Sequence, residues 1–225
     1  RDLDKAIDDY TTLIVQDDGE HKLKSYYKRG CAFYQQKKLS RAIEDFTRAI
    51  DLGYANKEEV YRKRSVARAE NDDLDGAIAD YNKIIKLNPG SGFAYYNRGD
   101  AYYRKDELDN AIEDFGKSIE LDYDMAKSYY HLGVARMDNG DLGGAFEDYN
   151  KSIGYDAENG AVYYYRGCLY SHQGNLDKAI EDFTKAIDLK YATVDVYCRR
   201  AGALVKNGDF GDAIWDYTKA IRIRS

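Results

Sequence analysis

Residues 95–123 read YYNRGDAYYRKDELDNAIEDFGKSIELDY, and this stretch is the clearest copy of a unit that recurs through the whole chain. Its landmark is the alanine that opens the segment AIEDF. The same slot returns at Ala6, Ala42, Ala77, Ala111, Ala145, Ala179 and Ala213, and the spacing settles at 34 residues. A fixed period of this length is typical of a stacked array of repeats rather than of ordinary domains.

Each unit contains two patterns of helical periodicity. With the landmark alanine numbered as position 20, complete units begin at residues 23, 58, 92, 126, 160 and 194, and residues 1–22 supply half a unit. The first pattern places apolar or aromatic residues at positions 4, 8, 11 and 12, and the second at positions 17, 20, 21, 24, 27 and 28. Spacings of three and four residues put each set on one helix face. The unit is therefore predicted to be a pair of helices.

Turn residues separate the two patterns, as in Gly140-Asp141 and Gly174-Asn175. Glycine suits the left-handed residue that ends a helix, and Asp or Asn suits the N-cap of the next helix. Glycine also recurs at position 8, where we expect it to face the position-20 alanine. An aromatic ring at position 24 is expected to fill the space beside that contact.

The period, the small residues at positions 8 and 20 and the aromatic residues at positions 4 and 24 resemble the tetratricopeptide repeat. The resemblance covers essentially the whole chain and implies an all-α fold. That fold is a right-handed superhelical solenoid of antiparallel helix pairs, with about six and a half repeats in one domain over residues 1–225. Two features depart from the family pattern: only Pro89 keeps its position-32 proline, and arginine replaces its position-7 leucine in five units.

Aspartate occupies position 23 in every unit, and arginine occupies position 7 in five of the six complete units. Because a guanidinium forms paired hydrogen bonds with a carboxylate, we expect a buried or half-buried ladder of Arg–Asp pairs, within hairpins or between units. Repeat four differs: it has Leu132 at position 7 and two glycines, Gly143 and Gly144, at the start of its second helix. Either sequence drift or a weak joint would account for these changes.

The family resemblance implies that a ligand lies on the concave face, near positions 2, 5, 9, 12 and 13 of the first helices. The candidate groove residues are Lys24, Tyr27, Tyr34, Arg62, Tyr96, Asp100, Tyr103, Tyr130, Tyr164, Cys198 and Arg199. Tyrosine suits peptide recognition, since it offers rigid contact area and a hydroxyl at low entropic cost. The alternative is that these rings pack between neighbouring first helices.

Charge distinguishes the two helices of the unit. The chain carries a formal charge of −6, which argues against a general nucleic-acid binder. The first-helix halves nevertheless carry an excess of basic residues, which favours an acidic ligand or one with a free C-terminal carboxylate. A mixed, solvated surface is the alternative. The residues at positions 5, 6 and 9 match neither the family's chaperone-binding carboxylate clamp nor its asparagine ladder.

An enzyme would have to rest on Cys168, His172 and Cys198. Cys168 and His172 lie four residues apart on one expected helix face, but a structural zinc site uses four ligands and no fourth is evident. The sequence has no glycine-rich phosphate loop and no HExxH segment. We therefore predict no catalysis, no metal and no cofactor.

The sequence favours a protein-interaction scaffold that binds a protein or peptide segment in its groove. A self-assembling array is the structural alternative, because the chain begins within a repeat and ends without a polar capping helix, and such ends expose apolar surface. The regulatory or substrate-recruiting arm of an enzyme is a further alternative, since we expect the chain to be a fragment. No stretch is apolar enough to span a membrane. Three scattered cysteines favour a reducing compartment, such as the cytoplasm, without assigning a location.

Overall fold

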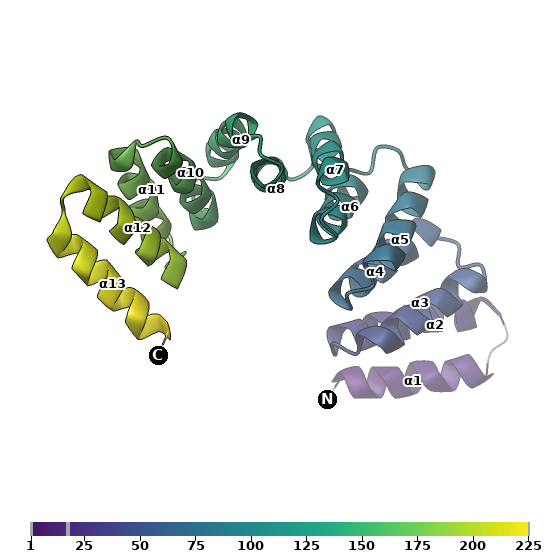
Figure 1. Ribbon diagram of the computed structural model, residues 1–225. Coiled ribbons are helices and arrows are strands. Elements are labelled where there is room, and N and C mark those ends of the chain that lie inside the picture. Colours follow the sequence, from purple (N-terminus) through teal and green to yellow (C-terminus); the bar gives the residue numbers. More distant parts are fainter. Residues whose placement is uncertain (1, 17–18, 225) are drawn as a thin grey trace. The chain divides into compact units, whose positions relative to one another are not determined.

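The computed structural model describes residues 2–16 and 19–224, and these residues form helices joined by short turns, with no strand among them. Thirteen helices follow one another along the described chain (Figure 1). They are α1 Asp2–Gln16, α2 Glu20–Gln35, α3 Leu39–Asp51, α4 Lys57–Glu70, α5 Leu74–Leu87, α6 Gly92–Arg104, α7 Leu108–Glu120, α8 Met125–Asp138, α9 Leu142–Tyr155, α10 Gly160–His172, α11 Leu176–Asp188, α12 Val194–Asn207 and α13 Phe210–Arg224.

Successive helices pack as hairpins, in which α2 pairs with α3, α4 with α5, and so on to α12 with α13. The all-α fold of stacked antiparallel helix pairs is thus confirmed. The first helices begin within three residues of the expected unit starts. The largest difference is at α2, which begins at Glu20, directly after its N-cap Gly19, rather than at residue 23. The chain falls into two compact units, Arg1–Leu121 (unit 1) and Asp122–Ser225 (unit 2). That the whole chain is a single solenoid domain stays a prediction.

The turn inside every complete hairpin has the same backbone form, with a left-handed residue at position 15. Glycine takes this place in Gly140, Gly174 and Gly208, and Lys37, Asp72 and Asp106 take it with φ between 58° and 63°. The next residue then caps the second helix in three hairpins, since the side chains of Asp73, Asp141 and Asn175 each accept a backbone N–H. Local turn chemistry therefore ends one helix and starts the next.

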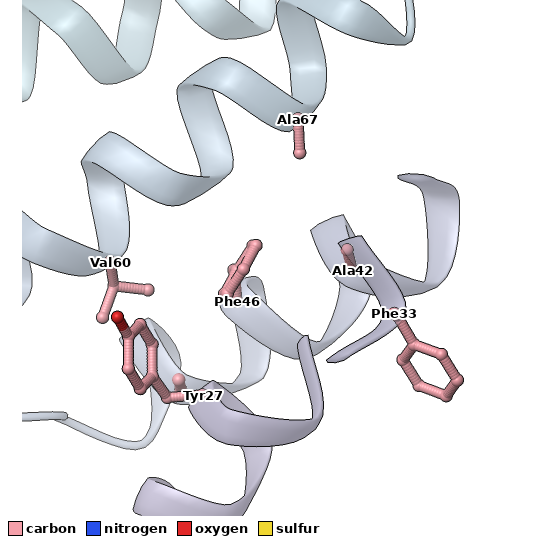
Figure 2. Packing of buried hydrophobic residues seen from close by; sticks show 7 residues of the cluster. Tyr27, Phe33, Ala42, Phe46, Val60 and Ala67 are labelled. Carbon is pink, nitrogen blue, oxygen red and sulfur yellow. The ribbon is translucent and has the colours of Figure 1, made fainter. Parts of the chain in front are cut away.

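The core of each hairpin is built on its second helix. The position-20 alanines and the position-24 rings are fully buried from α3 to α11. Figure 2 shows this arrangement in unit 1, where Phe46 of α3 lies beside Val60 and Ala67 of α4. The buried rings join each hairpin to the first helix that follows it within the unit.

The role of the position-8 glycines differs from the one expected. A Cβ atom on Gly30 would lie 2.9 Å from the ring of Phe46, and one on Gly133 would lie 2.7 Å from the ring of Tyr149. The position-24 ring, rather than the position-20 alanine, therefore occupies the space that the missing side chain leaves.

Two further buried positions escaped the sequence pattern. Position 3 (as in Val60 and Val196) and position 10 (as in Ala67 and Ala101) are almost fully buried. Their seven-residue spacing places both on the side of the first helix that meets the preceding hairpin. A small residue at these positions does not indicate burial in a single sequence, so only the packing of the structure shows that the positions are buried.

Candidate functional site

The predicted Arg–Asp ladder is present and lies within hairpins. In α4 and α5, Arg64 donates from Nε and Nη2 to the two carboxylate oxygens of Asp80, at 2.8 and 2.7 Å. The same two-pronged pairing joins Arg29 to Asp45, Arg98 to Asp114, Arg166 to Asp182 and Arg200 to Asp216. The five carboxylates are buried. These arginines are engaged inside the protein, which confirms their structural role.

Repeat four keeps its buried aspartate but changes the partner. Leu132 replaces the arginine, and Arg136, one helical turn later in α8, donates from Nη1 to Asp148 at 2.7 Å. Burial raises the pKa of Asp148 to about 6, although the charge and hydrogen bond of Arg136 oppose the shift. A single hydrogen bond compensates the desolvation of a carboxylate less than a two-pronged pair does.

Two of the position-5 tyrosines, Tyr27 and Tyr164, are buried, although Tyr164 still lines a hollow in unit 2. Tyr27 donates its hydroxyl hydrogen bond to Glu59, and Tyr164 donates to Asp195. Each acceptor is at position 2 of the next repeat, so the phenol joins two consecutive first helices. Burial, followed by this hydrogen bond, raises the pKa of Tyr27 and of Tyr164. Both hydroxyls therefore stay protonated and serve as fixed donors between repeats.

Arg199 belongs to the Tyr164 network. Its Nε donates to the Tyr164 oxygen at 2.9 Å and to Asp195 at 3.0 Å. Burial raises the pKa of Asp195, but the hydrogen bonds from Tyr164 and Arg199 outweigh burial and bring it below its usual value. Asp195 is therefore ionised and fixes the orientation of a largely exposed guanidinium.

Unit 2 contains a hollow of about 580 Å³ whose lining comes mostly from first helices. Its apolar lining includes Met137, Tyr165 and Leu169. Arg199, Lys206 and His172 supply basic side chains, and among the lining residues in the described chain there is no Asp or Glu. Arg199 and Lys206, two of the basic residues of the first-helix halves, therefore lie at this hollow without an acidic neighbour in its lining.

A second hollow, of about 520 Å³, lies in unit 1 between α2, α4 and the start of α6. Arg62 crosses the face of Phe93, with its guanidinium carbon 4.0 Å from the ring centre. Lys63 lines the hollow as well, but so do Glu58 and Glu59, which balance the two basic residues. The two units therefore offer hollows of different charge.

The other predicted groove residues lie at varied depths. Tyr34 lines the unit 1 hollow and donates to Glu70, which together with burial raises its pKa to about 12. Tyr96 packs edge-on against Phe115, and Tyr130 packs against His131 and Tyr165. Asp100, Tyr103 and Cys198 are half-buried, and Lys24 is exposed. That these residues contact a ligand stays a prediction.

The Cys/His set separates in the structure. Cys168 and His172 line the unit 2 hollow, whereas Cys198 does not. Burial raises the pKa of the Cys168 thiol, which is the opposite of the shift that activates a nucleophilic cysteine. Over the described residues, no group of three or more His, Cys, Asp or Glu side chains is placed to hold a metal.

Sequence reasoning missed the acidic residues at position 2 and the Arg62–Phe93 stack. The signal for the first was available, because Glu59 and Asp195 each follow a position-5 tyrosine in the preceding repeat. The sequence gave no comparable signal for the stack, because no other pair of consecutive repeats has arginine at position 5 followed by phenylalanine at position 2.

Hairpins stacked in order, with hollows lined mainly by first helices, define a helical-repeat protein. Models of the tetratricopeptide repeat match residues 27–92, 126–159 and 160–190, and a TPR repeat model matches residues 99–140. The chain belongs to the tetratricopeptide repeat family.

Curated relatives match part of the chain. The human mitochondrial import receptor subunit TOM70 is 29% identical over 103 residues, which are 46% of this chain and 16% of the relative. The TPR repeat-containing protein MJ1428 of Methanocaldococcus jannaschii is 33% identical over 93 residues, or 40% of this chain and 16% of that protein. The chain thus spans about a sixth of the length of these relatives.

Solved structures match a larger part of this chain. MamA is 27% identical, with a TM-score of 0.65, over 73% of this chain and 90% of its own. The C-terminal part of a TPR repeat-containing protein from Cytophaga hutchinsonii reaches a TM-score of 0.79 over 98% of this chain and 90% of its own, at 18% identity. The second likeness concerns the fold alone. No described helix is both long and apolar enough to cross a membrane.

Proposed function

We propose that this chain is a non-catalytic interaction scaffold that binds an extended peptide or protein segment on its first helices. The unit 2 hollow is the observation that carries the proposal, because it combines an apolar floor with Arg199, Lys206 and His172. An apolar lining with a few fixed polar groups is the usual composition of a ligand site. YrrB, a solved structure 22% identical to this chain, is described as a TPR protein with an unusual peptide-binding site.

The ligand that fits the unit 2 hollow carries an apolar side chain beside a carboxylate, either acidic or C-terminal. Arg199 is already oriented by Asp195 and Tyr164, so little side-chain entropy is lost when its exposed face meets an anion. The hollow in unit 1 has balanced charge and does not select for an anion in the same way.

The test uses an array of immobilised acidic peptides, each made with a free and with an amidated C-terminus. We expect wild-type protein to bind a subset that contains an apolar residue near the carboxylate, and binding to weaken as salt rises. The variant Arg199→Glu/Lys206→Glu should bind these peptides at least about tenfold more weakly, which corresponds to ~1.4 kcal/mol.

The charge-matched control is Lys185→Glu/Lys190→Glu, which changes two exposed lysines outside the unit 2 hollow. It should bind like the wild type. Equal losses of peptide affinity in the two variants would show that the effect comes from the net charge of the protein rather than from the unit 2 hollow. An array on which no peptide is bound would reject this ligand class.

Self-association is the second candidate, and one helix favours it. On α13, Phe210, Ile214, Trp215 and Ile221 are each more than half exposed. Exposed apolar side chains gathered on one element are typical of an interaction surface. The dependence of molecular size on protein concentration separates this candidate from peptide binding, which needs no second copy.

A further inference from the structure

A single arginine joins three helices at most steps from one repeat to the next. Besides its pair with Asp80, Arg64 donates from Nη1 to the hydroxyl oxygen of Thr47, at 2.9 Å. Thr47 is on α3, at position 25 of the preceding repeat, and its own hydroxyl donates to the carbonyl of Ile43. Because that donation fixes the hydroxyl hydrogen, the oxygen presents a lone pair to the arginine. We call this three-helix link the clamp.

The clamp recurs with the same geometry wherever position 7 is arginine. The acceptor at position 25 of the preceding repeat is either threonine or asparagine. The links are Arg29 to Thr11, Arg64 to Thr47, Arg98 to Asn82, Arg166 to Asn150 and Arg200 to Thr184. Charge-assisted hydrogen bonds of this kind are stronger than those between two neutral groups.

The step from repeat three to repeat four lacks both halves of the clamp. Position 7 is Leu132, which has no donor, and position 25 of the preceding repeat is Gly116, which has no side chain. Arg136 still pairs with Asp148 and also lies near Asp141, both of them in its own hairpin. Charge pairing inside the hairpin is therefore kept, while neither clamp position of this step carries a side chain that can form the clamp.

Two other observations fall at the same step. The boundary between the two compact units lies between Leu121 and Asp122. The connection from α7 to α8 also contains two left-handed residues that are not glycine, Asp122 at φ 51° and Asp124 at φ 37°. Among the connections whose residues are all described, no other has two. Left-handed backbone is less favourable for a residue with a Cβ atom than for glycine, so these two residues stabilise this connection less than glycines would.

We infer that the α7–α8 joint is a release point, at which the missing clamp leaves units 1 and 2 free to unfold independently. In a repeat array, cooperativity depends on the interaction between neighbours, and one weak interface divides the array into separate cooperative blocks. The clamps at the other joints extend cooperativity within each unit. This inference does not depend on what either hollow binds.

Scanning calorimetry tests the inference, because two independent units of similar size give a calorimetric enthalpy about twice the van't Hoff enthalpy when their midpoints coincide, and a larger ratio or two separate transitions when the midpoints differ. We expect a ratio of about two or more, or two transitions, for the wild type. The variant Gly116→Asn/Leu132→Arg restores both halves of the clamp and should lower the ratio toward one. A ratio of one for the wild type, or an unchanged ratio in a folded restored variant, overturns the proposal.

The converse variant covers the case in which an arginine introduced at position 132 disrupts packing. Asn82→Gly/Arg98→Leu/Tyr102→Arg transfers the arrangement of repeat four to the α5–α6 joint, and the arginine introduced at position 102 corresponds to Arg136. We expect the ratio to rise, because unit 1 is then divided in turn. Trp215, the one tryptophan of the chain, reports unit 2 separately by fluorescence, and its midpoint should not move. An unchanged ratio, or a Trp215 midpoint that shifts with unit 1, overturns the proposal.

Discussion

At the scale of single residues, the buried aspartates show how the partner sets the behaviour of an acid. All are desolvated, and in five hairpins a guanidinium fork satisfies both carboxylate oxygens. Removing one member of such a pair leaves an uncompensated buried charge, which is costly. Asp148 accepts a single hydrogen bond from Arg136, so its buried charge is already incompletely compensated.

Asp148 should make stability depend on pH between about 4 and 6. Its pKa is about 6 in the folded protein, and an aspartate in an unfolded chain titrates near 3.9. The folded state therefore binds the extra proton, and stability rises as pH falls through this interval. Urea titrations at pH 7 and pH 5 should show that the wild type gains roughly 1–2 kcal/mol relative to Asp148→Asn.

The Asp148→Asn variant removes the titrating group and leaves Arg136 with a neutral acceptor. Its stability should therefore follow only the remaining groups of the protein. Identical pH profiles for the two proteins would mean that the Asp148 carboxylate ionises at its ordinary pKa.

At the scale of helices, the glycines divide into those with a packing role and those without one. Gly133 of α8 lies against the Tyr149 ring, so that helix can approach α9 closely. Gly116 of α7 has no atom within 4 Å of where its Cβ atom would lie. The same residue type therefore allows close contact between helices at one site, whereas at the other it relieves no crowding and lowers helix propensity.

Alanine at these two positions should have opposite effects. Gly133→Ala places a methyl group 2.7 Å from a fully buried ring, and we expect a loss of about 1–3 kcal/mol from overpacking. Gly116→Ala meets no neighbour and should stabilise the protein by about 0.5–1 kcal/mol through reduced backbone entropy. Thermal and urea unfolding measure both. Two changes of the same sign would show that these sites do not differ in packing.

At the scale of the whole molecule, the two units differ in what they offer to a partner. The unit 2 hollow is basic with an apolar floor, the unit 1 hollow has mixed charge, and α13 exposes an apolar face. On α13, Tyr217 at position 24 is 41% exposed, whereas the equivalent rings in the five preceding hairpins are at most 1% exposed. The α13 residues equivalent to those that bury the interior joints are thus exposed in the described chain.

If α13 is a self-association surface, sedimentation should show a molecular mass that rises with protein concentration. The variant Ile214→Glu/Ile221→Glu should then remain monomeric, because it places two charges on the exposed face. The control Leu52→Glu/Leu87→Glu changes two exposed apolar residues of unit 1 and should behave like the wild type. A wild type that stays monomeric at every concentration would remove this candidate.

The sequence by itself determined the helix pairs, their order, the turn chemistry and the Arg–Asp pairing. Each of these depends on spacing along one or two helices, which a 34-residue period repeats until the pattern is unmistakable. It also placed the basic excess on the first helices, although it did not indicate that Arg199 and Lys206 line one hollow.

Only the tertiary structure decided which tyrosines are buried and what the third nitrogen of each arginine contacts. Tyr27 and Tyr164 are buried, and their hydroxyls bond to an acidic side chain because an acid occupies position 2 of the next repeat. The clamp likewise depends on residues about 17 positions apart that meet only when hairpins stack. Contacts between repeats involve packing distances and side-chain directions, which periodicity within one helix does not encode.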